Sequence, residues 1–257
     1  MNFIIIAFLC IMIMLQYVTD SGYYICLSFE RITMSSFEKK ILPRYSWAYL
    51  IAAALCNSLC YFGTRLVTSH RHHILLDTML DDSIPLCTFF IVFYFLAYIQ
   101  WIVSYVFIAR EGKSFCYDLV MGDIIAKLIC GICFILVPTT LVRPEITGSG
   151  VFDQLTRWLY QIDAADNLFP SIHCLESYMA LRAAYMMKKM PSWYKPFTLV
   201  FSLLVFASTV LLKQHLLIDI AGGILVAEVG IQIAARTKIG RKVSPEKLRK
   251  AIIRTWP

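Results

Sequence analysis

The strongest constraint on the fold is a series of long apolar segments, separated by short polar connections, that fills most of the chain. These segments lie at residues 3–18, 47–61, 84–108, 119–142, 170–187, 197–212 and 215–235. A helix needs about 20 mostly apolar residues to cross the hydrocarbon core of a bilayer. Hydrophobic residues make up 59% of the chain and charged residues only 16%. The sequence therefore predicts an all-α, polytopic transmembrane helix bundle with six core helices.

The chain divides into three predicted parts. Residues 1–35 hold the first apolar segment, which lacks the positive start and the small-residue cleavage site of a signal peptide. Two interpretations of this segment stay open: an additional helix, or a protein that begins at Met34. Residues 36–235 form the predicted membrane domain. Residues 236–257 form a basic tail, which we expect in the cytoplasm.

Lysine and arginine gather in alternate connections between the apolar segments. The connections at 36–46, 109–118 and 188–196 are basic, as is the tail, whereas the connection at 145–166 is mainly acidic. Short loops rich in Lys and Arg stay on the cytoplasmic side of a membrane. This pattern predicts an integral membrane protein, here assigned to the plasma membrane, whose acidic connections face the extracytoplasmic side.

Ionisable residues stand at the edges of three apolar segments, on the predicted extracytoplasmic side. Arg143 precedes Pro144, His173 follows Pro170 and Ser171, and Lys213 and His215 stand between two apolar segments. Burying a charged group at membrane depth costs free energy, so we interpret each of these residues as a candidate functional residue. Their common side predicts one shared site.

The residue types at this site favour phosphoryl transfer. Asp219 follows His215 by four residues, so a helix would place both on one face. A carboxylate bound to one ring nitrogen fixes the tautomer and leaves the other nitrogen free to attack. Pro170 predicts the first turn of a helix, whose free N–H groups favour an anion. Arg143, Ser171 and Lys213 would then hold phosphoryl oxygens.

These residues resemble the motifs of the type 2 phosphatidic acid phosphatase superfamily, which includes the vanadium haloperoxidases. Arg143-Pro144 is similar to the end of the first motif, and Pro170-Ser171-Ile172-His173 to the second, with Ile in place of Gly. The third motif is represented by Ser208, His215 and Asp219. The first-motif lysine and the third-motif arginine are replaced by Leu136 and Thr209. Relaxed first and third motifs resemble the lipid phosphotransferase branch, which includes sphingomyelin and inositol phosphorylceramide synthases.

The resemblance implies a lipid phosphate phosphatase that works through a phosphohistidine, without a metal or cofactor. It implies His215 as the nucleophile, Asp219 as the residue that orients it, and His173 as the general acid and then base. The expected partners are a lipid phosphate substrate and membrane lipids, with no nucleic acid. Two alternatives stay open. One is a phosphotransferase that uses a lipid or alcohol acceptor, and the other is a membrane protein with a decayed site.

Other polar residues in the apolar segments have simpler interpretations. Asp123 and Lys127 are four residues apart, which predicts an ion pair within one helix. Glu176, Arg182 and Glu228 are expected to find partners on neighbouring helices. Cys130 and Cys133 are interpreted as small apolar residues. The histidines at 70–73 are interpreted as a solvated loop.

Overall fold

Residues 42–244 are described in the computed structural model of the chain, so the hypotheses for residues 1–35 and for most of the tail lie outside it. The described part is mostly helical. Several of its helical segments are long and apolar enough to cross a membrane: Arg44–Thr68, Thr88–Glu111, Lys113–Leu136, Tyr194–Leu211 and Leu217–Thr237. The chain is therefore a helical integral membrane protein, as the sequence predicts.

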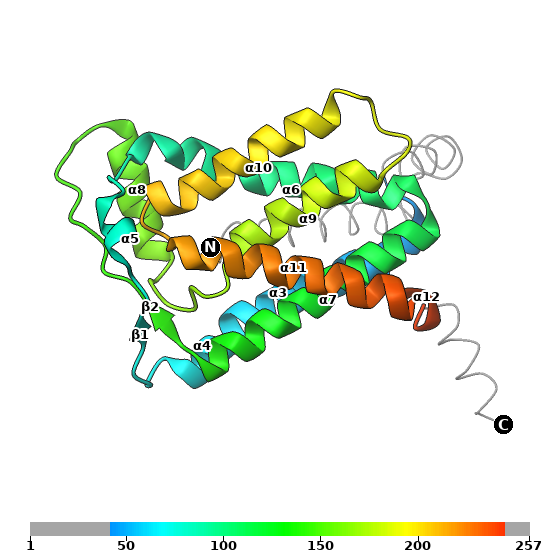
Figure 1. The fold of residues 1–257 in the computed structure, drawn as a ribbon, viewed down its shortest axis with the longest axis horizontal. Coiled ribbons are helices and arrows are strands. Elements are labelled where there is room, and N and C mark those ends of the chain that lie inside the picture. The colour runs from blue at the N-terminus through cyan, green and yellow to red at the C-terminus, as the bar shows by residue number, and fades with distance from the viewer. Residues whose placement is uncertain (1–41, 245–257) are drawn as a thin grey trace, which may run out of the picture.

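The helix α7 (Lys113–Leu136) packs most extensively on α11 (Leu217–Thr237), which runs beside it in Figure 1. Gly122 and Gly230 allow this contact, because a Cβ added at Gly230 would lie 2.3 Å from the Gly122 carbonyl oxygen. On its other sides α7 contacts α3 (Trp47–Ser58) and α6 (Ile91–Glu111). The two small residues thus let the two helical backbones touch.

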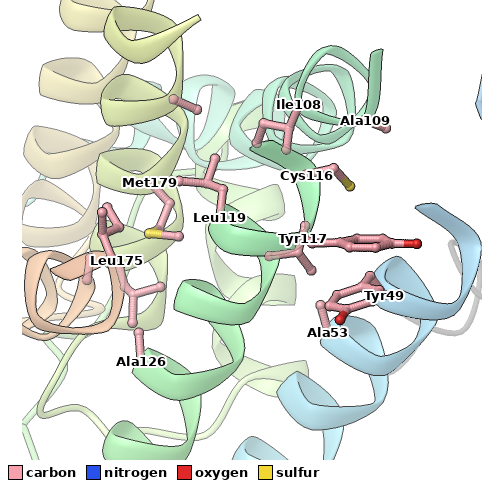
Figure 2. Packing of buried hydrophobic residues seen from close by; sticks show 14 of the residues in the cluster. Tyr49, Ala53, Ile108, Ala109, Cys116, Tyr117, Leu119, Ala126, Leu175 and Met179 are labelled. Carbon is pink, nitrogen blue, oxygen red and sulfur yellow. The ribbon is translucent and has the colours of Figure 1, made fainter. Parts of the chain in front are cut away.

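Aromatic and aliphatic side chains fill the space on both sides of α7. Tyr117 stacks on Tyr49 of α3, with ring centroids 4.3 Å apart. Figure 2 shows Tyr117 directed toward α3, while Leu119 of the same helix points toward Met179 of α9 (Ile172–Met186). Burial of such side chains stabilises a close-packed core.

The first span, α9 and α10 (Tyr194–Leu211) complete the bundle. The first span is continuous from α3 through a π-helical turn at Leu59–Gly63 into α4 (Thr64–Thr68). The helix α10 packs on α9 and α6. With 15 residues, α9 is shorter than the five candidate spans, which have 18 to 25 residues. It measures about 22 Å at 1.5 Å per residue. It also contacts α11 and α7, so it lies inside the bundle.

Two predicted boundaries were wrong. The expected connection at 109–118 is reduced to Gly112, whose φ of 155° and ψ of 156° suit only glycine, and α6 and α7 continue on either side. The apolar segment predicted at 119–142 is not helical to its end. Pro138 disfavours helix at Val137, and the chain continues into β2 (Thr139–Thr140), which pairs in parallel with β1 (Ile74–Leu75).

The basic connections and the β strands lie at opposite ends of the bundle. Figure 1 shows α12 (Ile239–Lys242) at one end, and β1, β2, α5 (Met79–Ser83) and α8 (Val151–Ile162) at the other. At the basic end Glu111 accepts from the Lys188 N–H at 3.0 Å. Arg241 is ion-paired with Asp118 at the same end. The charge pattern of the sequence thus corresponds to the two ends of the molecule.

The sequence did not predict α8, because its length and polarity are those of a connection. Its inner face buries Thr156 and Leu159, whereas Val151, Leu155 and Trp158 are exposed. This helix lies next to α6 and therefore covers the end of the bundle that holds the predicted site.

Candidate active site

A cavity of about 180 Å³ opens inside the bundle. It is lined by α3, α6, α7 and α9, by the connection between α8 and α9, which includes Asp163 and Asp166, and by the connection before α11. His173 and His215 both line it, and their ring centroids are 5.8 Å apart. Both side chains are buried, with 7% and 8% of their surfaces exposed. The structure thus brings together two histidines that are 42 positions apart in the sequence (215 − 173).

His173 is held in place by aromatic residues of α6. Its Nε2 lies 2.9 Å from the Tyr98 hydroxyl, and its ring stacks on Tyr94 with centroids 4.4 Å apart. Ring nitrogens of histidine exchange donor and acceptor roles with the tautomer. The Tyr98 hydroxyl can serve either role, so it can stay bound while the ring gains or loses a proton.

Asp219 contacts His215, as the spacing predicts, but the geometry differs from the expected one. The Oδ2 atom of Asp219 lies 3.3 Å from Nδ1 of His215 and accepts from the Leu216 N–H at 2.9 Å. Leu216 is the N-cap of α11, so His215 precedes the helix instead of sharing its face. Within residues 42–244 no hydrogen bond to Nε2 of His215 is present, and this nitrogen is available to a substrate.

The beginnings of α9 and α11 are locked together, which fixes the distance between the histidines. The Ser171 N–H donates to the Asp219 carbonyl oxygen at 3.0 Å. A Cβ added at Gly223 would lie 2.5 Å from the Ser171 carbonyl oxygen. Ser171 is the N-cap of α9 and accepts from the Cys174 N–H. Pro170 therefore precedes the cap and does not occupy the first turn, contrary to the prediction.

Arg143 reaches the site through another residue. Its guanidinium donates to the Asp163 carbonyl oxygen at 2.6 Å and to Oε1 of Gln214 at 2.7 Å. It also lies over the Tyr160 ring, 4.5 Å from the centroid. Arg143 does not line the cavity, whereas Gln214 does. The predicted arginine thus holds a glutamine beside His215.

Gln214 is a site residue that sequence reasoning missed. An arginine has only donors, so its contact fixes Oε1 toward Arg143 and leaves Nε2 on the other side of the amide. Nε2 is buried and has no partner among the residues that the structure describes. The only signal in the sequence was its position next to His215. An unpaired buried donor at this place is suited to an anionic oxygen.

Lys213 lies on the other side of His215. Its backbone is left-handed, with a φ of 50°, and its Nζ donates to the Asp81 carbonyl oxygen at 2.7 Å. It lines a second cavity of about 80 Å³, together with His215, Asp77, Asp81 and Asp82. The two predicted cations are therefore both engaged with protein oxygens. Arg143 contacts Gln214, and Lys213 lines the second cavity with His215.

Asp81 joins α5 to the start of α11 and has a lowered pKa. Burial acts to raise the pKa of this carboxyl, but hydrogen bonds from Thr78 and from the Leu217 N–H outweigh it. The Leu217 N–H lies 2.8 Å from Oδ1 of Asp81. The ionised form is thus favoured, and the contact fixes the chain just after His215.

Within residues 42–244, no group of three His, Cys, Asp or Glu side chains is arranged to hold a metal ion. Cys130 and Cys133 are free thiols on α7. In comparisons with protein-family models, with curated proteins and with solved structures, nothing matches this chain.

Proposed function

We propose that this protein is an integral-membrane lipid phosphate phosphatase that acts through a phosphohistidine, with its site at the extracytoplasmic face. One observation carries the proposal. His215, bound by Asp219 at Nδ1, and His173 line the same cavity inside a membrane bundle, 5.8 Å apart between ring centroids. The arrangement supports membership of the type 2 phosphatidic acid phosphatase superfamily, which the motifs resemble.

The reaction has two steps in this proposal. Nε2 of His215 attacks the phosphorus, the bond to the lipid alcohol breaks, and the protonated His173 gives its proton to the leaving oxygen. Water then attacks the phosphohistidine while His173 takes a proton from it, which frees inorganic phosphate and restores both rings. Asp219 stabilises the positive charge on His215 in the first step. The proton that leaves His173 returns in the second step, so no cofactor is needed.

The phosphoryl oxygens are bound by Gln214 in this proposal, through the amide Nε2 that has no partner among the described residues. Arg143 acts as a positioning residue, because it fixes the amide orientation through Oε1. Ser171 positions His173 by capping α9. Lys213 adds positive charge from the second cavity. Preorganised donors of this kind stabilise charge as it develops.

The proposed topology has six spans, with α9 as the sixth, and a cytoplasmic C-terminus in the plasma membrane. The segregation of the basic connections at the end opposite the histidines supports this orientation. The helix α9 is surrounded by α6, α7, α10 and α11, so it can be short without exposing its ends to lipid. The substrate phosphate then sits in the outer leaflet.

A phosphate-release screen of the purified full chain tests the proposed function. The substrates are phosphatidic acid, phosphatidylglycerophosphate, a sphingoid phosphate and a polyprenyl pyrophosphate, each in mixed micelles. We expect release from at least one of them, and none from His215→Ala protein of equal thermal stability. Release that is equal in the two proteins, or absent with every substrate, contradicts the proposal. The second outcome would favour a decayed site.

A phosphotransferase is the second candidate, and the second cavity favours it. His215 borders both cavities, so a lipid bound in the larger one leaves the smaller one free for an acceptor hydroxyl. A water-miscible alcohol added during turnover separates the two functions. A phosphorylated alcohol that accounts for most of the product identifies a transferase, whereas free phosphate in proportion to substrate loss identifies a hydrolase.

A further inference from the structure

The main cavity extends past the histidines to a buried ion cluster. Nζ of Lys127 lies 2.8 Å from Oδ2 of Asp123 and 2.5 Å from Oε1 of Glu176. The side chain of Lys127 is only 3% exposed, yet Lys127 and Glu176 both line the cavity. The predicted pair within α7 is confirmed, and Glu176 joins it from α9. The ammonium group of Lys127 therefore lines the space that a substrate would occupy.

Glu176 follows His173 by three residues on α9, so the two share a face. Three residues rise roughly 4.5 Å along a helix axis, which puts the cluster about one turn deeper than the histidines. The Tyr105 hydroxyl donates to Oε2 of Glu176 at 3.0 Å and lines the same cavity. The cluster thus forms a second polar site at a fixed depth below the reaction centre.

The hydrogen-bonding capacity of Lys127 is not exhausted. An ammonium has three donors, and the described residues provide acceptors for two of them, on Asp123 and Glu176. Both oxygens of Glu176 are also engaged, by Lys127 and Tyr105. Among the described residues, Oδ1 of Asp123 also has no hydrogen-bond partner, but Asp123 does not line the cavity. The unused group of the cluster on the cavity wall is therefore the third donor of the Lys127 ammonium, which suits an oxygen acceptor.

Charge neutralisation alone does not explain this position. A second ion pair between helices, Arg182 with Glu228 at 2.9 Å, joins α9 to α11 and does not line the main cavity. Ionisable groups at membrane depth are costly unless they act on a ligand or on one another. Other parts of the cavity wall are apolar, with Leu50 and Ala54 on α3 and Ile102 and Val106 on α6. Ile102 is also 40% exposed, so this side chain belongs both to the cavity wall and to the outer surface of the bundle.

We propose that Lys127 forms a second binding site, which takes the carbonyl oxygen of an acyl ester or amide a few bonds from the phosphate. The substrate class is then an acylated lipid phosphate, whose chain leaves between α3 and α6, and not a polyprenyl phosphate or an ether lipid. This inference rests on the proposed function, because the distance of Lys127 from the phosphate is taken from the position of the catalytic histidines. A hydrogen bond from a charged donor is stronger than one between neutral groups, so the carbonyl contributes to specificity.

The test compares two substrates that differ only in the carbonyl oxygen. Phosphate release by the purified full chain is measured with 1-acyl-glycerol phosphate and with 1-O-alkyl-glycerol phosphate of equal chain length. We expect kcat/KM to be about tenfold higher for the acyl lipid. Equal values in the wild-type protein overturn the inference, whatever the variants do.

Two variants and a matched control assign the preference to the ammonium group. Lys127→Met should reduce the acyl-to-alkyl ratio to about one, and Lys127→Arg, which keeps a charged donor, should restore most of it. If Lys127→Met is unstable, the double variant Lys127→Met/Asp123→Asn removes one charge of each sign. Arg182→Met/Glu228→Gln removes the ion pair between α9 and α11 that lies away from the main cavity, and it should keep the wild-type ratio. A purely structural role for Lys127 lowers both rates together and leaves the ratio unchanged, which also overturns the inference.

A second measurement distinguishes failure of the proposed phosphatase function from failure of the proposed carbonyl-binding site. If neither lipid is hydrolysed, the same pair is compared by thermal stabilisation of the protein. Greater stabilisation by the acyl lipid, lost in Lys127→Met, supports the carbonyl site without catalysis. Equal stabilisation contradicts it.

Discussion

One carboxylate oxygen, Oδ2 of Asp219, contacts both Nδ1 of His215 at 3.3 Å and the Leu216 N–H at 2.9 Å. The same atom therefore orients the proposed nucleophile and caps the helix that follows it. A substitution of Asp219 therefore affects both the orientation of His215 and the stability of α11, unless the new side chain keeps one of the two contacts.

His215→Ala should abolish turnover without loss of the fold, since removal of a covalent nucleophile costs about 1,000-fold or more. Asp219→Asn can still accept from the Leu216 N–H, so the melting temperature should change little, while the activity falls less than in His215→Ala. Asp219→Ala also loses the hydrogen bond to the N-cap N–H of Leu216, which costs about 1 kcal/mol of stability. Phosphate release and thermal melting are measured on all three. More than a few per cent of activity in His215→Ala sinks the nucleophile assignment.

Gln214→Leu should slow formation of the phosphoenzyme by about 100-fold, because it removes a preorganised donor to the phosphoryl oxygen. Arg143→Ala should produce a smaller loss, since the glutamine remains but its amide is free to rotate. Rapid quenching in base, which preserves phosphohistidine, measures the rate. Lys213→Met is the comparison, because its ammonium is bound to the Asp81 carbonyl. A larger loss in Lys213→Met than in Gln214→Leu would make the lysine the principal phosphate ligand.

Activity should not depend on a divalent metal. His, Gln and Lys are poor ligands for Mg²⁺, which prefers carboxylates and water, and Asp219 is already bound to His215 and Leu216. Full activity is expected in excess EDTA, with inhibition by vanadate, which mimics the phosphoryl transition state. Loss of activity on chelation, followed by recovery with Mg²⁺, would contradict the mechanism.

The contact of Asp81 with α11 should make the stability depend on pH. Its pKa in the folded protein lies below the usual value, so its contribution is complete above an ordinary aspartate pKa of about 3.9. That contribution is lost as the pH falls through the lower, folded value. Melting temperatures of wild type and Asp81→Asn should differ most near neutral pH and converge in acid. A difference that grows toward acid would show that burial, and not hydrogen bonding, controls this carboxyl.

The proposed orientation predicts a labelling pattern in intact cells. Ser149 and Lys242 are both exposed. Ser149 shortly precedes α8 and Lys242 ends α12, and these two helices lie at opposite ends of the bundle in Figure 1. An impermeant maleimide should react with Ser149→Cys and not with Lys242→Cys, above the background of the parent protein. Permeabilised cells give the maximum labelling of each. The reverse pattern would move the substrate to the inner leaflet.

Local sequence patterns predicted the helices and the pairing of His215 with Asp219, because both depend on residues close in the chain. The i,i+4 pair of Asp123 and Lys127 was confirmed for the same reason. Partners between helices were expected for Glu176, Arg182 and Glu228, but their identities depend on how the helices pack. Gln214 was missed because its importance arises from Arg143, which is 71 residues away. The close helix contacts at Gly223 and Gly230 also could not be predicted, because each depends on a residue of another helix.

The exposed apolar face of α8 has a consequence for kinetics. Val151, Leu155 and Trp158 are 69%, 37% and 41% exposed beside the end of the bundle that holds the histidines. A helix with such a face lies at the boundary between acyl chains and headgroups. It would hold the protein at a constant level in the leaflet, where a lipid arrives by lateral diffusion. The initial rate should then follow the mole fraction of lipid phosphate in the membrane, and diluting the whole suspension with buffer should leave turnover per protein unchanged.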